Sequence, residues 1–242
     1  MSNALTQSEQ KKLVGSTAID RLIEKGLIKS NMKIGLGTGS TAMPAVHRLA
    51  ERISDGTLTG IRAVATSYQT TLACEELGIP VYSLSSREIG GQLDLAIDGA
   101  DEITPENNLI KGGGAAHMKE KLVEYSAAQL VIIADESKEV TTLGTKFPLP
   151  VEVIAEGRVP VIAALEKLGA HCTIREGVKK AGPVITDNGN LVVDCVWDKP
   201  VDPAKLEDAI DAITGVVENG FFTKNHPLVF IAHADGTVSE RA

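Results

Sequence analysis

Gly35-Leu-Gly-Thr-Gly-Ser-Thr-Ala42 is the stretch of sequence that decides the predicted fold. A short apolar run, residues 32–36, leads into it, and apolar residues at helical spacing follow over 41–54. A strand that passes through a glycine-rich turn into a helix opens a βαβ unit. The same alternation extends around it, with helices predicted at 6–25, 68–77 and 115–128 and strands at 61–65, 81–84, 93–97 and 130–134. The pattern predicts an α/β fold with a Rossmann-like, doubly wound, mostly parallel sheet.

Phe147-Pro-Leu-Pro150 interrupts this alternation, because proline removes a backbone donor and is confined to the ends and edges of strands. Beyond it we predict strands at 151–154, 171–175, 184–186, 191–196 and 216–222 and helices at 159–168 and 203–213. That β-α-β-β-α-β order is typical of a small ferredoxin-like unit. The last apolar run, residues 228–232, is predicted to return to the first sheet. We therefore predict an α/β catalytic domain of residues 1–150 and 225–242, with a small α+β domain, residues 151–224, inserted into it.

Composition and charge disfavour several classes of partner. The formal net charge of -8 disfavours nucleic acid, whose phosphates are bound by clusters of Lys and Arg. No window approaches the roughly 20 apolar residues of a membrane span, and the start of the chain lacks the apolar core of a signal peptide. Cys74, Cys172 and Cys195 are widely spaced and suggest neither a disulfide framework nor a zinc site. We expect a cytoplasmic protein that binds neither nucleic acid nor membranes.

The glycine-rich turn is predicted to bind a phosphate group. A helix that begins after such a turn directs its N–H groups at an anion, and Thr38, Ser40 and Thr41 add hydroxyl donors. A dinucleotide is disfavoured because Thr66-Ser67-Tyr68, and not a carboxylate for a ribose, follows the next strand. A nucleotide P-loop is excluded because no Gly-Lys-Ser or Gly-Lys-Thr stands at the required spacing. A plain tight turn is the alternative.

A pair of carboxylates follows another predicted strand, in Asp98-Gly-Ala-Asp-Glu102. Asp98 and Asp101 stand where a buried strand reaches the surface, so each could accept hydrogen bonds from sugar hydroxyls or move a proton. A helix-capping aspartate and a magnesium site are the alternatives. Magnesium is disfavoured where Lys111 shares the site, because its ammonium group already supplies positive charge.

Lys111-Gly-Gly-Gly-Ala-Ala116 is the third motif. The ammonium group of Lys111 and the N–H groups of residues 112–114 could converge on a developing oxyanion. The alternative is a surface lysine before a flexible loop, but three consecutive glycines are entropically costly unless something must approach the backbone closely. Because ligands bind beyond the carboxyl ends of parallel strands, we expect the three motifs to form one sugar-phosphate site.

The pattern does not identify the group that moves protons. Glu120 lies in a predicted helix among Lys119, Lys121 and Glu124, which is typical of a solvated charged face. Spacing does not distinguish Glu120 from Glu124 or Glu102 as a base. The histidines show neither ligand spacing nor a Ser-His-Asp order, so we predict no metal site and no nucleophilic triad.

In this order, the three motifs resemble those of ribose-5-phosphate isomerases of the A type. The likeness covers nearly the whole chain and includes KFPLPVEV at 146–153, TDNGN at 186–190 and DPAKLEDAI at 202–210. It implies an aldose-ketose isomerase of the non-oxidative pentose phosphate pathway, which interconverts D-ribose 5-phosphate and D-ribulose 5-phosphate through an enediolate. It also implies a sugar phosphate as the small-molecule substrate, no metal or organic cofactor, and a homodimer or a dimer of dimers.

The resemblance also implies roles for individual residues. Glu120 would be the general base, and Lys111, Asp98 and Asp101 the other catalytic groups. The substrate-binding residues implied are Lys11, Thr38, Gly39, Ser40, Thr41, Asp98, Gly99, Ala100, Asp101, Lys111, Gly112, Gly113, Gly114 and Lys138. The sequence departs from the family's pattern at His117, where an apolar residue is expected, and over 156–161.

Two other classes of function stay open. A non-catalytic sugar-phosphate sensor could use the same loops, although the chain shows no basic helix-turn-helix. A coenzyme A transferase-like protein or an aminosugar-phosphate isomerase could share the sheet and the glycine loops. The lack of a conspicuous catalytic histidine arrangement counts against the aminosugar reaction.

Overall fold

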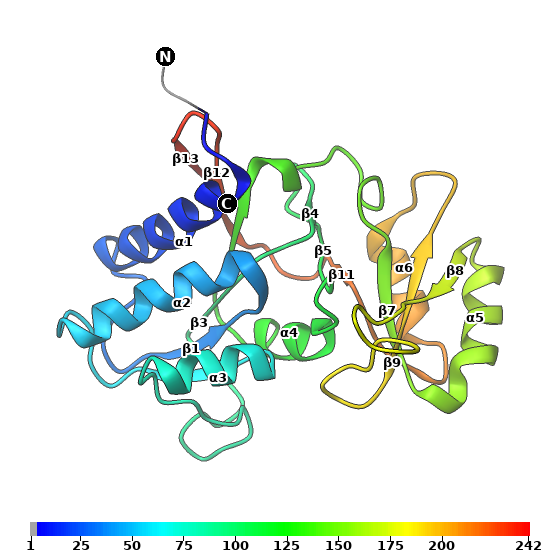
Figure 1. Ribbon diagram of the computed structural model, residues 1–242, viewed down its shortest axis with the longest axis horizontal. Helices are drawn as coiled ribbons and strands as arrows, with labels where there is room; N and C mark the ends of the chain where they lie inside the picture. The colour runs from blue at the N-terminus through cyan, green and yellow to red at the C-terminus, as the bar shows by residue number, and fades with distance from the viewer. Residues whose placement is uncertain (1–3) are drawn as a thin grey trace. The chain divides into compact units, whose positions relative to one another are not determined.

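The computed structural model describes residues 4–242 and groups them into two compact units (Figure 1). Unit 1 contains the chain up to residue 99, residues 119–138 and residues 226–242. Unit 2 contains residues 100–118 and 139–225. This grouping does not test the domain bounds predicted from the sequence, which stay a prediction.

Unit 1 is built on a six-stranded sheet in the order β13-β12-β6-β3-β1-β2. Its strands are β1 Lys33–Leu36, β2 Arg62–Ala65, β3 Leu95–Asp98, β6 Leu130–Asp135, β12 Leu228–Ala232 and β13 Val238–Arg241. All neighbouring strands are parallel except β12 and β13, which pair antiparallel at one edge. Strand β6 is buried along its whole length, as expected where both faces of a parallel sheet are covered. The predicted doubly wound α/β class is confirmed.

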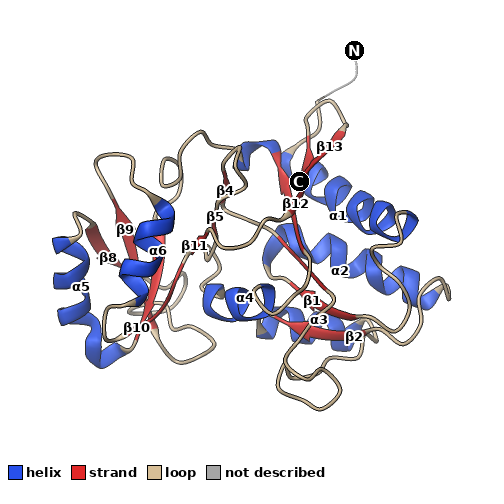
Figure 2. Ribbon diagram, turned by 180° about the vertical axis from the view of Figure 1, so that it is seen from behind, coloured by secondary structure: helices blue, strands red, loops and turns tan. Residues whose placement is uncertain are grey.

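Helices cover both faces of this sheet. They are α1 Gln7–Glu24, α2 Gly39–Ser54, α3 Tyr68–Glu76 and α4 His117–Glu124. Figure 2 shows α1 and α2 side by side, and both share a core with Ile34 and Leu36 of β1. Gly35 faces the other way, because a Cβ atom there would lie 2.6 Å from the Val123 side chain of α4. No helix in the described part of the chain is long and apolar enough to cross a membrane.

Helices α1 and α2 approach each other closely at Gly15. A Cβ atom on Gly15 would lie 2.7 Å from the Cβ of Pro44 and 2.8 Å from the backbone nitrogen of Ala45. At position 15, a side chain larger than hydrogen therefore does not fit between the two helices. The contact helps to place the start of α2, which carries the glycine-rich turn.

Unit 2 contains a four-stranded antiparallel sheet in the order β10-β7-β9-β8. Its elements are β7 Leu149–Val153, α5 Arg158–Lys167, β8 His171–Ile174, β9 Leu191–Val196, α6 Pro203–Asp211 and β10 Val216–Asn219. This chain order is the predicted β-α-β-β-α-β arrangement, so the ferredoxin-like unit is confirmed. A second sheet, in the order β11-β5-β4, joins β4 Glu102–Ile103, β5 Leu109–Ile110 and β11 Phe221–Phe222.

Two predicted strands are wrong. Residues 81–84 and 184–186 make only isolated bridges, one between Val81 and Ala63 and one between Ile185 and Leu191. A proline precedes each segment, at Pro80 and Pro183, and removes a donor that a longer ladder would need. The helix predicted over 115–128 is also shorter, because the chain turns after it to pair with residue 93.

We expect Gly15→Val to lower the free energy of unfolding by about 1–3 kcal/mol, because the added side chain forces α1 away from α2. Urea unfolding followed by circular dichroism measures the loss. Lys12→Val places a valine at an exposed position of the same helix, away from the contact, and is the control. Valine has a higher helix propensity than glycine, so a loss of stability in Gly15→Val cannot come from propensity. Equal stability of the two variants would contradict the close contact.

Candidate functional site

The glycine-rich turn joins β1 to α2 in unit 1. Gly37 has no room for a side chain, since a Cβ atom there would lie 1.9 Å from Oδ1 of Asp98. Thr38 is the N-cap residue of α2, but its side chain does not cap the helix. Its hydroxyl instead lies 2.7 Å from those of Thr66 and Ser67. The N–H of Gly39 donates to Gln69.

The first turn of α2 keeps donors available for an anion. Among the described residues, the N–H groups of Ser40 and Thr41 make no hydrogen bond. The Nζ of Lys11, from α1, lies 3.1 Å from the hydroxyl of Ser40. The predicted phosphate-binding residues of unit 1 therefore lie together at a helix N-terminus that also carries a cation.

Asp98 ends β3, next to β1, and is 1% exposed. Its Oδ1 accepts the N–H of Thr38 at 3.0 Å and the N–H of Gly99 at 2.7 Å. A Cβ atom on Gly99 would lie 3.3 Å from the Cβ of Thr41. The first two predicted motifs thus meet at the carboxyl end of the parallel strands.

The two remaining predicted residues of unit 1 are Glu120 and Lys138. Glu120 is 5% exposed and Glu124 is 0% exposed. The solvated charged face predicted from the sequence is therefore wrong for this side of α4. Lys138 ends a short 3-10 helix, Glu136–Lys138. This helix follows the carboxyl end of β6, and Asp98 lies at the carboxyl end of the neighbouring parallel strand β3.

The lysine-glycine loop belongs to unit 2 and follows β5. Lys111 is 2% exposed, and its Nζ lies 5.4 Å from the centroid of the Phe222 ring, so the alternative of a surface lysine is wrong. Gly112 has φ +103°, and a Cβ atom there would lie 2.7 Å from the buried His117 ring. Open space surrounds the Cα of Gly114, where a Cβ atom would meet nothing within 4 Å.

Asp101 lies against this loop and follows Ala100 in unit 2. Its Oδ2 accepts the N–H of Gly113 at 2.7 Å. One of the three glycine donors predicted for an oxyanion is therefore already used by an aspartate. The structure brings Asp101 and residues 111–114 together within unit 2.

Glu102 has a different task from its neighbours. It is 0% exposed and accepts the N–H groups of Gly144 at 2.6 Å, Lys146 at 2.5 Å and Phe147 at 2.8 Å. A carboxylate held by backbone donors on both oxygens is committed to structure. Of the three glutamates left open as the base, Glu102 is thereby disfavoured.

The hydroxyl groups that hold Thr38 were not predicted from the sequence. Besides Thr66 and Ser67, Thr70 lies 3.2 Å from the Thr38 hydroxyl and donates to the carbonyl of Gly37 at 2.7 Å. Their signal was present, because Thr66-Ser67 stands where a dinucleotide-binding protein would carry an acidic residue.

Cys74 and Cys195 lack the lowered pKa of a nucleophilic thiol. All three cysteines are free thiols. Burial raises the pKa of Cys74 to about 11, and the neighbouring Glu75 adds to the shift. A hydrogen bond with Cys172, whose Sγ lies 3.8 Å away, raises the pKa of Cys195 further above the ordinary range. Within residues 4–242, no three His, Cys, Asp or Glu side chains are grouped as a metal ion would need.

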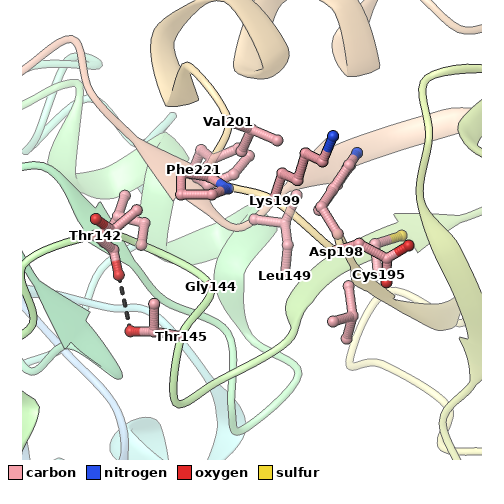
Figure 3. Close-up of a pocket in the computed structure, with 13 residues that line it drawn as sticks. Thr142, Gly144, Thr145, Leu149, Cys195, Asp198, Lys199, Val201 and Phe221 are labelled. Atoms are coloured by element: carbon pink, nitrogen blue, oxygen red, sulfur yellow. Dashed lines mark hydrogen bonds between the residues drawn. The ribbon is translucent and has the colours of Figure 1, made fainter.

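A pocket of about 230 Å³ in unit 2 contains none of the predicted site residues (Figure 3). Leu149 and Phe221 give it apolar walls, and Lys199 lies on its lining. In its lining loop, the hydroxyl of Thr145 donates to the carbonyl of Thr142 at 2.8 Å (Figure 3).

Comparisons with known proteins agree on one family. Residues 62–236 match the model of the family described as ribose 5-phosphate isomerase A, or phosphoriboisomerase A. The chain is 59% identical to the ribose-5-phosphate isomerase A of Treponema denticola, over 96% of this chain and 98% of that protein. It is 51% identical to the Treponema pallidum protein of the same name, over 98% and 94%.

Solved structures give the same result. A D-ribose-5-phosphate isomerase in complex with phospho-erythronic acid superimposes with a TM-score of 0.90, at 39% identity, over 98% of this chain and 100% of that one. Ribose 5-phosphate isomerase A from Methanocaldococcus jannaschii gives a TM-score of 0.88 at 39% identity, with the same coverage.

We expect Glu102→Gln to destabilise the protein by about 2–4 kcal/mol, because the new amide group turns a donor toward buried N–H groups that lose their acceptor. Urea unfolding compares it with Glu106→Gln, which makes the same change at an exposed position nearby. A Glu102→Gln variant as stable as the control would show that these backbone donors do not depend on the carboxylate.

Proposed function

The chain belongs to the ribose-5-phosphate isomerase A family, and we propose that it carries out this isomerisation by moving one proton between C2 and C1 through an enediolate. The enzyme interconverts D-ribose 5-phosphate and D-ribulose 5-phosphate, as its relatives of 59% and 51% identity do. Its substrate is a sugar phosphate. The mechanism rests above all on the burial of Glu120, an acidic side chain withdrawn from water in a helix that follows the lysine-glycine loop.

Glu120 is the base that takes the proton from C2 and returns it to C1. The two other acidic candidates fit less well, since Glu102 is held by backbone donors and Glu124 is completely buried. Glu120 keeps 5% exposure, so it is the more accessible of the two residues on α4. A single carboxylate serves both directions of the reaction, because the proton leaves one carbon and returns to its neighbour.

Lys111 and the N–H of Gly114 stabilise the negative oxygen of the enediolate. Lys111 is 2% exposed, so water weakens the field of its charge little. A Cβ atom on Gly114 would meet nothing within 4 Å, so its backbone is not shielded on that side, whereas the Gly113 N–H is used by Asp101. Preorganised donors of this kind contribute about 10²–10³ each to the rate.

The aspartates manage the protons of the sugar hydroxyls. Asp98 is 1% exposed and holds two backbone N–H groups on one oxygen, which suits a fixed acceptor for a hydroxyl. Asp101 is more exposed and accepts one backbone N–H group, at Gly113, so we assign it the proton transfer that opens the sugar ring. Gly99 and Ala100, which lie between the two aspartates in the sequence, contact the substrate through their backbone.

The phosphate group of the substrate binds at the start of α2. Residues 38–41 supply N–H and hydroxyl donors there, and Lys11 supplies a cation. Lys138, beyond β6, is a further substrate contact. The phosphorylated four-carbon acid in the related structure of TM-score 0.90 is consistent with a site that binds a phosphate and an anion at the other end of the ligand.

We further propose a cytoplasmic homodimer or dimer of dimers that needs neither a metal nor an organic cofactor and has no nucleic-acid or membrane partner. The free thiols support a reducing compartment, and the net charge of -8 supports the exclusion of nucleic acid. Light scattering on the purified protein measures the subunit number.

We expect Glu120→Gln to lower kcat by about 10²–10⁴, because the amide cannot accept the C2 proton. The inhibition constant of inorganic phosphate should change little, since phosphate binds at α2. A coupled assay on ribose 5-phosphate measures the rate, and incorporation of solvent deuterium at C1 of the ketose measures proton transfer. Glu76→Gln, exposed on α3, is the control. Near-full turnover of Glu120→Gln would refute the assignment.

We expect full isomerase activity after exhaustive dialysis against EDTA, because Lys111 supplies the positive charge that a metal would otherwise bring. The coupled assay is repeated with and without added Mg²⁺, Mn²⁺ or Zn²⁺. Activity that disappears with EDTA and returns with one of these ions would overturn the cofactor-independent mechanism.

A further inference from the structure

Arg175, directly after β8, contacts the lysine-glycine loop from a segment that the mechanism does not use. Its Nη1 donates to the carbonyl of Gly112 at 2.9 Å and to the carbonyl of Gly113 at 3.1 Å. The side chain is 14% exposed. A largely buried guanidinium group therefore binds two consecutive peptide carbonyls of the loop.

Asp194 in β9 fixes the orientation of this guanidinium group. Nε of Arg175 lies 2.9 Å from Oδ2 of Asp194, and Nη2 lies 2.5 Å from Oδ1. The two strands are paired, with the N–H of Arg175 donating to the carbonyl of Val192 at 2.9 Å. A bidentate pair on paired strands leaves the planar guanidinium little freedom, so Nη1 is aimed at the loop.

The two carbonyls belong to the peptide groups whose N–H groups matter for the reaction. The Gly112 carbonyl shares its peptide group with the N–H of Gly113, which donates to Asp101 at 2.7 Å. The Gly113 carbonyl shares its peptide group with the N–H of Gly114. In a trans peptide group the C=O and N–H point in opposite directions, and none of the described peptide bonds is cis.

Holding both carbonyls on Arg175 therefore turns both N–H groups away from it. The Gly112 carbonyl also accepts the N–H of Ala115 at 3.0 Å, so Arg175 matters most for the peptide group between Gly113 and Gly114. The N–H of Gly113 points to Asp101. The N–H of Gly114 points away from the guanidinium group, and a Cβ atom on Gly114 would meet nothing within 4 Å. Glycine backbones rotate easily, and rotation of a single peptide group would reverse the direction of its N–H. A positive charge on a carbonyl also polarises its peptide group and strengthens its N–H as a donor.

We propose that Arg175, held by Asp194, is a positioning residue. It fixes the peptide groups that carry the Gly112 and Gly113 carbonyls, so that the N–H of Gly114 faces the developing oxyanion. The inference rests on the proposed isomerase mechanism. It predicts that Arg175 affects binding of the enediolate more than binding of the phosphate, because it acts only on the loop.

The test uses the full-length enzyme with Arg175→Met, Asp194→Asn and the control Arg158→Met, which removes an exposed arginine that also donates to a carbonyl, that of Ala155. We expect Arg175→Met to lower kcat about 10- to 100-fold and to weaken inhibition by phospho-erythronic acid by a similar factor. KM and inhibition by inorganic phosphate should stay within about threefold of the wild type. Asp194→Asn should cause a smaller loss of the same kind.

Other outcomes would overturn the proposal. A kcat within threefold of the wild type for Arg175→Met would do so, as would equal weakening of phospho-erythronic acid and inorganic phosphate. If Arg175→Met does not fold, Arg175→Lys replaces it, because lysine keeps the charge but not the bidentate fork. An Arg175→Lys variant with the wild-type kcat and the wild-type inhibition by phospho-erythronic acid would refute the role. Failure of the wild type and Arg158→Met to isomerise ribose 5-phosphate would instead refute the proposed function.

Discussion

The hydrogen bonds from the N–H groups of Thr38 and Gly99 to one oxygen of Asp98 are the interaction on which the proposed phosphate site depends. They join the ends of two neighbouring parallel strands, and they require a glycine at 37, where a side chain would occupy the space of the carboxylate. Because Asp98 takes the N–H of the N-cap residue, the turn is shaped without a side-chain cap on α2. The N–H groups of Ser40 and Thr41, in the first turn of the helix, are therefore left for an anion.

The same use of carboxylates recurs in unit 2. Asp101 holds the backbone of the lysine-glycine loop, and Glu102 holds a loop of residues 144–147. Arg175 acts on the same glycine backbone from the carbonyl side. In the lysine-glycine loop, side chains thus bind both the N–H groups and the carbonyl groups of the backbone. This allows consecutive glycines, which are otherwise flexible, to keep one defined conformation beside the proposed catalytic residues.

Local patterns predicted the fold well because each element carries its own signal: apolar strands, glycine-rich turns and helical spacing. The first two motifs lie where the parallel strands β1 and β3 end, as predicted. The lysine-glycine loop instead follows β5, a strand of an antiparallel sheet in unit 2. The failures have two causes. The burial of Glu120 and Lys111 was not predicted, because a charged residue looks the same in sequence whether water or protein surrounds it. Arg175 was not predicted because it lies far along the chain from the loop it contacts, and only the fold brings them together.

The hydroxyl groups of Thr66, Ser67 and Thr70 around Thr38 have a consequence for how the enzyme uses its substrate. The turn proposed to receive the phosphate is already held by these hydrogen bonds, so little conformational entropy would be lost there on binding. The intrinsic affinity for the dianion can then be applied to holding the open-chain sugar at its reactive carbons. An unphosphorylated pentose brings the same carbons without this anchor, and would be a poor substrate even though its chemistry is identical.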